Sequence, residues 1–199
     1  MDITRILILG GARSGKSSYA LKLAESNWRR PLYVATAEAF DKEMIARIAA
    51  HRKARSRRWD CAEEPLELAR LINRAGKLYP ARDVLLVDCL TLWLNNVIFK
   101  EGLKSFQRRK TGLLKAVRNS KRSLIMVSNE VGLGIVPESE AGRQFRDLAG
   151  WLNQDVASVA DTVVFVASGL PLVLKGKLLE KGTEAQRQKA QRERRRNAE

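Results

Sequence analysis

Ile6-Leu7-Ile8-Leu9-Gly10-Gly11-Ala12-Arg13-Ser14-Gly15-Lys16-Ser17 is the stretch of this 199-residue chain that decides its fold. Four apolar residues predict a buried strand, and the next eight fit the phosphate-binding loop pattern G-x-x-x-x-G-K-[ST]. The backbone N–H groups of such a loop surround a polyphosphate, and the helix that follows adds the positive end of its dipole. We expect the glycines to let the backbone approach the phosphates, Lys16 to contact the β- and γ-oxygens, and Ser17 to ligate Mg²⁺. The stretch therefore predicts a site for a nucleoside triphosphate.

Strand-like and helix-like segments alternate along the chain, which predicts an α/β fold with a mainly parallel sheet and helices on both faces. The expected strands are residues 6–9, 32–35, 84–87, 124–127 and 163–166, with a short last one at 172–174. The expected helices are residues 16–27, 41–55, 65–74 with Gly76 closing it, 90–99, 104–117, and one from the cap Ser139 to about Ala160.

Length and composition fit one catalytic domain over residues 1–175 followed by a basic tail over 176–199. No run approaches the ~20 apolar residues of a membrane span, and the N-terminal apolar stretch ends in the loop rather than in a cleavage site. We expect a cytoplasmic protein. Cys61 and Cys89 lie far apart in the sequence, so they predict reduced thiols rather than a zinc site or a disulfide framework.

The formal net charge of +15 is large enough to suggest a polyanionic partner. Part of it lies in the tail, because residues 175–199 hold nine Lys or Arg against four Glu. The body is also basic, and residues 47–58 hold six cations and no acid. Such a cluster can be a solvated face, a nucleic-acid track or the lining of a site for small polyanions.

Asp88 ends the buried run at 84–87, where a phosphate-loop fold places a second residue that holds the metal. A carboxylate there can instead cap the next helix. With the loop at Gly10–Ser17 upstream, we favour the metal role.

His51 is the only histidine in the chain. A lone histidine is usually a surface or core residue without a chemical duty. The neighbouring cations change this interpretation, because they disfavour the protonated imidazole and could hold a polyphosphate beside a neutral nucleophile. This arrangement suits attack on phosphorus.

The glycine-rich stretch at residues 129–137 follows another predicted strand. Ligands in open α/β sheets bind at the carboxyl ends of the strands, so we expect this loop to contact substrate or another subunit. A simple tight connection is the alternative.

Several motifs together resemble the family of bifunctional adenosylcobinamide kinases and adenosylcobinamide-phosphate guanylyltransferases of cobalamin biosynthesis. The resemblance covers residues 4–175 in unbroken order. It runs through the loop at 10–17, Tyr-Val-Ala-Thr-Ala at 33–37, Arg-Ile-x-x-His at 47–51, Val-Asp-Cys-Leu-Thr at 87–91 and Asn-Glu-Val-Gly at 129–132.

The resemblance implies a RecA-like phosphate-loop fold, a trimer, Mg²⁺, and ATP and GTP as substrates beside a corrinoid. It implies phosphorylation of adenosylcobinamide, then transfer of GMP from GTP through a guanylyl-histidine, for which the matching residue is His51. It also implies nucleotide contacts at Ala35, Thr36, Ala37, Arg52, Lys53, Ala54, Arg55, Glu63 and Asp88.

Two alternatives stay open. A RecA-like nucleic-acid-binding ATPase suits the fold type and the charge, although the basic residues are not interleaved with aromatic ones. A small-molecule kinase without guanylyl transfer would leave His51 unused.

Overall fold

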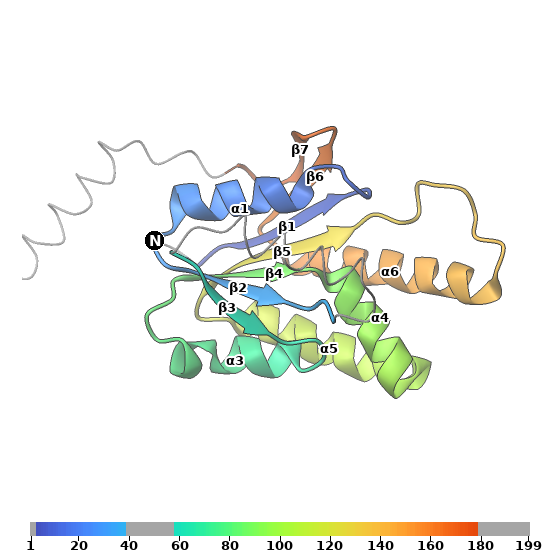
Figure 1. The fold of residues 1–199 in the computed structure, drawn as a ribbon, viewed down its shortest axis with the longest axis horizontal. Helices are drawn as coiled ribbons and strands as arrows, with labels where there is room; N and C mark the ends of the chain where they lie inside the picture. The colour runs from blue at the N-terminus through green and yellow to red at the C-terminus, as the bar shows by residue number, and fades with distance from the viewer. Residues whose placement is uncertain (1–2, 39–57, 179–199) are drawn as a thin grey trace, which may run out of the picture.

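A seven-stranded sheet forms the centre of the molecule in the computed structural model, which describes residues 3–38 and 58–178 (Figure 1). The strands are β1 (Arg5–Gly10), β2 (Pro31–Ala35), β3 (Asp60–Glu63), β4 (Val84–Asp88), β5 (Ser123–Asn129), β6 (Thr162–Ala167) and β7 (Leu170–Lys175). Their order across the sheet is β3-β2-β4-β5-β1-β6-β7. All neighbours pair in parallel except β6 and β7, which form an antiparallel hairpin.

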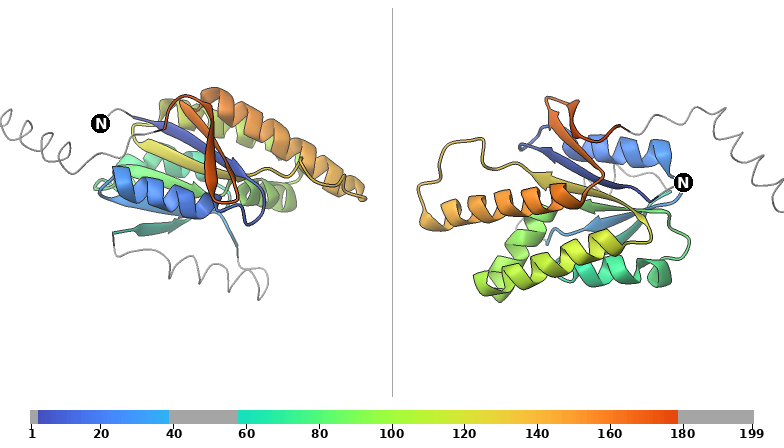
Figure 2. Two further views of the ribbon diagram at one scale, coloured as in Figure 1. Left: turned by 90° about the horizontal axis from the view of Figure 1, so that it is seen from above. Right: turned by 180° about the vertical axis from the view of Figure 1, so that it is seen from behind.

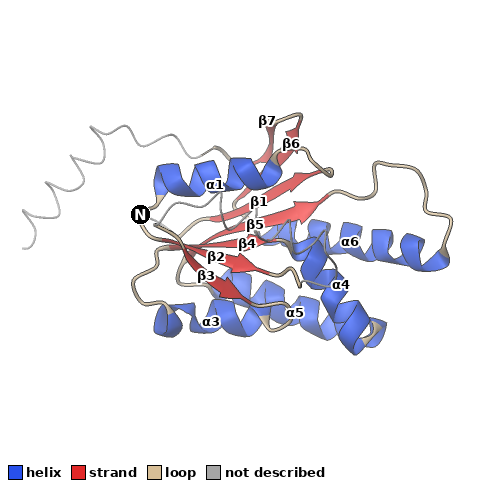
Figure 3. Cartoon of the chain, in the orientation of Figure 1, coloured by secondary structure: helices blue, strands red, loops and turns tan. Residues whose placement is uncertain are grey.

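Helices cover both faces of the sheet, as expected (Figures 2 and 3). They are α1 (Lys16–Asn27), α3 (Leu68–Leu78), α4 (Leu90–Glu101), α5 (Leu103–Asn119) and α6 (Glu140–Val159). Among the described helices, α1 alone lies on one face, and the other four lie on the opposite face. None of the helices within the described ranges is long and apolar enough to cross a membrane. The helix expected at 41–55 falls outside the described residues.

Alternation along the strands builds two cores, one on each face. Ile6 and Ile8 of β1 pack with Ala20 and Ala24 of α1. Leu7 and Leu9 of β1 point to the opposite face and belong to the core beneath the four helices. Because the central strands are buried on both faces, they appear in the sequence as continuous apolar runs. Complete burial of one such side chain contributes roughly 1.5–3 kcal/mol to the free energy of folding. The buried strands are therefore held firmly, and their ends fix the positions at which the loops leave the sheet.

The sheet differs from the sequence-based expectation at its two edges. β3 was not expected, because in Asp60–Glu63 only Ala62 is buried and no apolar run marks the strand. Backbone pairing with β2 forms it instead. β7 begins earlier than expected, at Leu170, because the hairpin with β6 continues to the turn at Ser168 and Gly169.

The expectation that Gly76 closes a helix is wrong. α3 continues through it to Leu78, and its C-terminal cap at Tyr79 donates its N–H to the carbonyl of Ala75. The buried residues Leu71, Ile72 and Ala75 keep helical spacing up to this point, and their packing outweighs the ~1 kcal/mol cost of one interior glycine.

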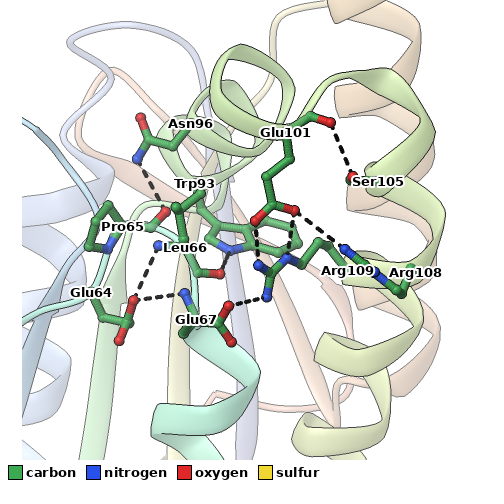
Figure 4. A network of polar contacts seen from close by, with 10 residues as sticks. All are labelled: Glu64, Pro65, Leu66, Glu67, Trp93, Asn96, Glu101, Ser105, Arg108 and Arg109. Atoms are coloured by element: carbon green, nitrogen blue, oxygen red, sulfur yellow. Dashed lines mark hydrogen bonds and ion pairs between the residues drawn. The ribbon is translucent and has the colours of Figure 1, made fainter.

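A polar network joins α3, α4 and α5 on the four-helix side (Figure 4). The Nε of Arg109 donates to Oε2 of Glu101 at 3.0 Å, and its Nη1 lies 2.5 Å from Oε1 of Glu67. The hydrogen bonds from Arg109 hold the pKa of the Glu101 carboxyl below its usual range, and Glu101 in turn raises the pKa of Arg109. Arg109 of α5 thus holds both the end of α4, through Glu101, and the start of α3, through Glu67.

The same network holds the loop between β3 and α3. The indole N–H of Trp93 donates to the carbonyl of Leu66 at 2.9 Å, and the amide of Asn96 donates to Pro65. The carboxylate of Glu64 accepts from the N–H groups of Leu66 and Glu67. These contacts hold the connection that leaves the carboxyl end of β3.

Replacing Glu101 by Gln is expected to lower the free energy of unfolding by about 1 kcal/mol at neutral pH, because the side chain is only 21% exposed and its charge-assisted hydrogen bonds weaken. A depressed carboxyl pKa stabilises the fold above the unfolded-state value, near 4.3, and that stability is lost as pH falls through the folded-state pKa. The difference from wild type should therefore be constant above about pH 5 and vanish in acid. Urea unfolding measured between neutral and acid pH tests this.

Glu138→Gln is the matched control, because Glu138 is exposed and its carboxylate forms no ion pair within the described part of the chain. An equal effect of the two substitutions would contradict the role of the network.

Candidate functional site

The phosphate-binding loop lies at the carboxyl end of β1, in the middle of the sheet. Lys16 is buried, and its Nζ donates to the carbonyl of Gly11 at 3.1 Å, so the side chain folds back over the loop. The first turn of α1 holds no acidic residue. The positive end of the helix dipole is therefore available to an anion at this position.

Two glycines of the loop are required by geometry. Gly15 has a φ of +93°, a conformation that other residues adopt only at a cost. A Cβ on Gly10 would lie 2.5 Å from the carbonyl oxygen of Val166. Close packing against β6, rather than approach to a phosphate, thus explains Gly10. A Cβ on Gly11 would meet nothing within 4 Å, so the space beside this residue is open.

The loop is fixed to its neighbours on both sides. The N–H of Glu130, just past β5, donates to the carbonyl of Gly10 at 3.0 Å. The N–H of Gly169, in the β6–β7 turn, donates to the carbonyl of Ser14 at 2.8 Å. The sequence does not reveal this role of Gly169, because only the hairpin brings that turn to the loop.

Asp88 ends β4, two strand spacings or about 10 Å from β1. Its Oδ2 accepts a hydrogen bond of 2.9 Å from the hydroxyl of Tyr33 on β2. Tyr33 is buried, with its ring edge-on to Trp59 at 6.1 Å between centroids. Sequence analysis did not identify Tyr33 as a site residue, because only the register of β2 against β4 brings its hydroxyl to the carboxylate.

Ser17 and Asp88 have the oxygen donors that Mg²⁺ prefers. No group of three or more metal-binding side chains occurs within residues 3–38 and 58–178. Such a sparse set fits Mg²⁺, which takes one or two protein ligands and fills its shell with phosphate oxygens and water. In the loop itself, the Ser14 hydroxyl is buried without a hydrogen-bond partner within the described residues, as expected of a loop shaped around an anion.

Thr36 fixes the backbone beside Asp88. It is fully buried, and its hydroxyl donates to the carbonyl of Cys89 at 2.7 Å and accepts from the N–H of Cys89 at 2.8 Å. Asn96 donates to the carbonyl of Thr36 at 2.8 Å. With its side chain engaged in this way, Thr36 holds the ends of β2 and β4 together, and Ala35 and Ala37 flank it on the same strand end.

The two cysteines are free, as expected, with Cys61 exposed and Cys89 buried. Burial raises the pKa of the Cys89 thiol to about 12, with a further contribution from the charge of Asp88. The thiol is therefore protonated near neutral pH and is a poor nucleophile.

The structure does not place the other predicted nucleotide-binding residues beside the phosphate-binding loop. Glu63 ends the edge strand β3, four strand spacings or about 19 Å from β1. His51, Arg52, Lys53, Ala54 and Arg55 lie outside the described residues.

The loop at 129–137 projects from the carboxyl end of β5 and leads into α6, which extends beyond the sheet (Figure 1). Leu133 and Ile135 are 80% and 97% exposed. Arg143 of α6 donates to the carbonyl of Pro137 at 3.1 Å, and Ser139 caps the helix by accepting from Gly142. The loop therefore presents apolar side chains from an anchored base.

Comparisons with known proteins give one consistent result. Residues 6–174 match the family described as cobinamide kinase / cobinamide phosphate guanyltransferase. The bifunctional adenosylcobalamin biosynthesis protein CobP of Pseudomonas aeruginosa is 45% identical over 175 residues, with 88% of this chain and 99% of that protein covered. The protein of the same description, CobU, from Escherichia coli K12 is 36% identical, with coverages of 85% and 99%.

Solved structures support the fold. The ATPase EscN of the type III secretion system of enteropathogenic E. coli superposes with a TM-score of 0.53 at 13% identity, covering 83% of this chain and 43% of that one. At this identity the likeness shows the fold alone, which is of the RecA-like phosphate-loop type. Because the family match spans residues 6–174, the chain belongs to the cobinamide kinase / cobinamide phosphate guanyltransferase family and is a bifunctional kinase and guanylyltransferase.

Proposed function

We propose that this enzyme phosphorylates the hydroxyl of the aminopropanol arm of adenosylcobinamide and then transfers GMP from GTP to the new phosphate. The product is adenosylcobinamide-GDP. The observation that carries this proposal is the phosphate-binding loop with Lys16 folded over it and Asp88 held nearby, in a chain of this family. Family membership also sets aside the nucleic-acid-binding ATPase as the main activity.

In the kinase reaction, the corrinoid hydroxyl oxygen forms a bond to the γ-phosphorus of ATP or GTP, the bond to the β-phosphate oxygen breaks, and the hydroxyl proton is lost. The loop and Lys16 position the phosphates and neutralise their charge. Mg²⁺ held by Ser17 and Asp88 would add charge at the transferred group. This half needs no imidazole.

In the guanylyl transfer, an imidazole nitrogen of His51 attacks the α-phosphorus of GTP, and the bond to pyrophosphate breaks. An oxygen of the corrinoid phosphate then attacks the same phosphorus and releases His51. Donors aimed at the departing pyrophosphate stabilise the charge that develops on it. Lys16 and the loop backbone supply these donors.

His51→Ala is expected to abolish covalent labelling by GTP carrying a radioactive α-phosphate, because no nucleophile remains. Transfer of a labelled γ-phosphate to adenosylcobinamide should stay within about twofold of wild type. The measurement is the acid-labile label on the protein beside the labelled corrinoid product. Lys16→Ala is the contrasting control, since it should impair both reactions.

Label retained by His51→Ala would contradict the assignment of the nucleophile. Phosphorylation without any label on the wild-type protein would support instead the kinase without guanylyl transfer.

We further propose that Tyr33 positions Asp88 for the metal, because its hydroxyl donates directly to the carboxylate from a buried position. Tyr33→Phe removes this donor and keeps the ring contact with Trp59. A partner of this kind typically changes metal affinity by 10–100-fold, so we expect about a tenfold increase in the Mg²⁺ concentration required for nucleotide binding. Titration of Mg²⁺ against binding of a fluorescent GTP analogue measures it.

Tyr79→Phe is the matched control, since Tyr79 lies at the end of α3, far from the strand ends that carry the site. Equal Mg²⁺ dependence of the Tyr33→Phe and wild-type proteins would refute the positioning role.

We also propose that the enzyme forms a homotrimer in which the exposed apolar loop at 129–137 contacts another copy. Ile135→Asp should then shift the mass in light scattering from three chains of 22.4 kDa toward one, because a charge would be buried at the contact. Leu78→Asp, at the exposed end of α3 and outside this loop, should leave the assembly intact. A trimer unaffected by Ile135→Asp would exclude this loop as the contact.

A further inference from the structure

The helices α3 and α5 carry nine Lys or Arg residues and no Asp or Glu. They lie side by side on the four-helix face of the sheet, as both views of that layer show (Figures 1 and 2). No acidic residue within these two helices offsets their positive charge. The proposed reaction uses none of these residues.

Helical spacing directs the charges away from the sheet. On α5, Lys104, Lys115 and Arg118 recur at intervals of eleven and three residues, opposite the side that buries Phe106 and Leu113. At 100° per residue, this places the cations on the outermost line of the helix. The stripe from residue 104 to residue 118 is about 21 Å long.

The same arrangement occurs on α3. Its exposed cations are at positions 70, 74 and 77, opposite the side that buries Leu68 and Ile72. We call the six residues Arg70, Arg74, Lys77, Lys104, Lys115 and Arg118 the basic face. Together the two stripes place six cations on the outer side of two adjacent helices.

Neighbouring acids pair with the other three cations of α5. Arg109 pairs with Glu101 and Glu67, Arg108 lies 3.7 Å from the Glu101 carboxylate, and Lys110 lies 2.5 Å from Asp155. Within the described ranges, no ion pair is formed by any of the six residues of the basic face. Their charge is directed to solvent and to a partner.

A shallow pocket of about 270 Å³ lies on this surface. Lys115 and Arg118 line it together with Thr111, Leu114 and Asn119. It combines two cations, a hydroxyl and an amide with one apolar side chain. This set suits a phosphate joined to a small polar group, such as a lipid headgroup.

We propose that the basic face binds the surface of an anionic lipid bilayer. Each Lys or Arg near such a surface adds electrostatic attraction, and six suffice for reversible binding. Leu78 at the end of α3 and Leu103 at the start of α5 are 51% and 43% exposed. Apolar side chains beside a basic helical face are typical of proteins that lie on a membrane without spanning it.

The composition of the face favours a bilayer over the other partners. Sequence readout of a duplex requires an element that enters a groove, whereas these cations lie on two helices packed side by side in a layer. Single strands require aromatic platforms, and none of the six residues is aromatic. A second copy docked through the same face would bring like charges together.

Sedimentation with vesicles tests the proposal. The full chain should bind vesicles of equal parts phosphatidylglycerol and phosphatidylcholine, but not pure phosphatidylcholine, and should dissociate between about 0.1 M and 0.5 M salt. The triple variant Lys104→Glu, Lys115→Glu, Arg118→Glu should bind at least about 100-fold more weakly. Circular dichroism and GTP binding verify that the variant is folded.

The matched control is Lys22→Glu, Arg29→Glu, Arg30→Glu, which makes the same change in net charge at exposed positions of the α1 side. It should retain binding. Equal loss in both variants would show a net-charge effect and overturn the proposal. Failure of the wild type to bind, or binding to RNA through this face without binding to vesicles, would also overturn it. None of these outcomes bears on the proposed reaction.

Discussion

The conformation of the phosphate-binding loop is the constraint on which the rest of the site depends. Its start is held by the hydrogen bond from Glu130 to Gly10, and its middle by the one from Gly169 to Ser14. Gly15, at a φ of +93°, then turns the chain into α1. Each tie comes from the carboxyl end of a strand next to β1, so the loop is set by the sheet and not by its own sequence alone. A preorganised loop of this kind binds a polyphosphate without ordering itself first.

Tyr33 connects Asp88 to the packed cluster beside α1. Its hydroxyl holds Asp88, and its ring packs against Trp59, which precedes β3. The indole N–H of Trp59 donates to the carboxylate of Glu25 on α1 at 2.8 Å. The chain that contains His51 leaves β2 after Ala35 and returns at Trp59, so both of its ends are fixed within the same packed cluster.

Sequence patterns predict what depends on local chemistry and buried runs, and miss what depends on register. The loop, α1 and the interior strands follow from glycine spacing and continuous apolar residues, and they were predicted nearly to the residue. β3 was not predicted, because an edge strand held by backbone pairing needs no apolar pattern. The roles of Tyr33 and Gly169 were not predicted for a related reason. Each residue contacts a partner that is distant in the sequence and that only the folded sheet brings near.

The basic face and the nucleotide site can both bind their ligands at once, because they lie on different sides of the fold. The loops of the site leave the sheet at the carboxyl ends of its strands, whereas the basic face is the outer surface of the helical layer. A bilayer against α3 and α5 would therefore run alongside the sheet and leave its carboxyl edge open to a large substrate. The inner ion pairs of Arg109 and Lys110 hold that layer together. They allow the outer positions to carry like charges at little cost, because exposed cations a helical turn apart repel by only a few tenths of a kcal/mol.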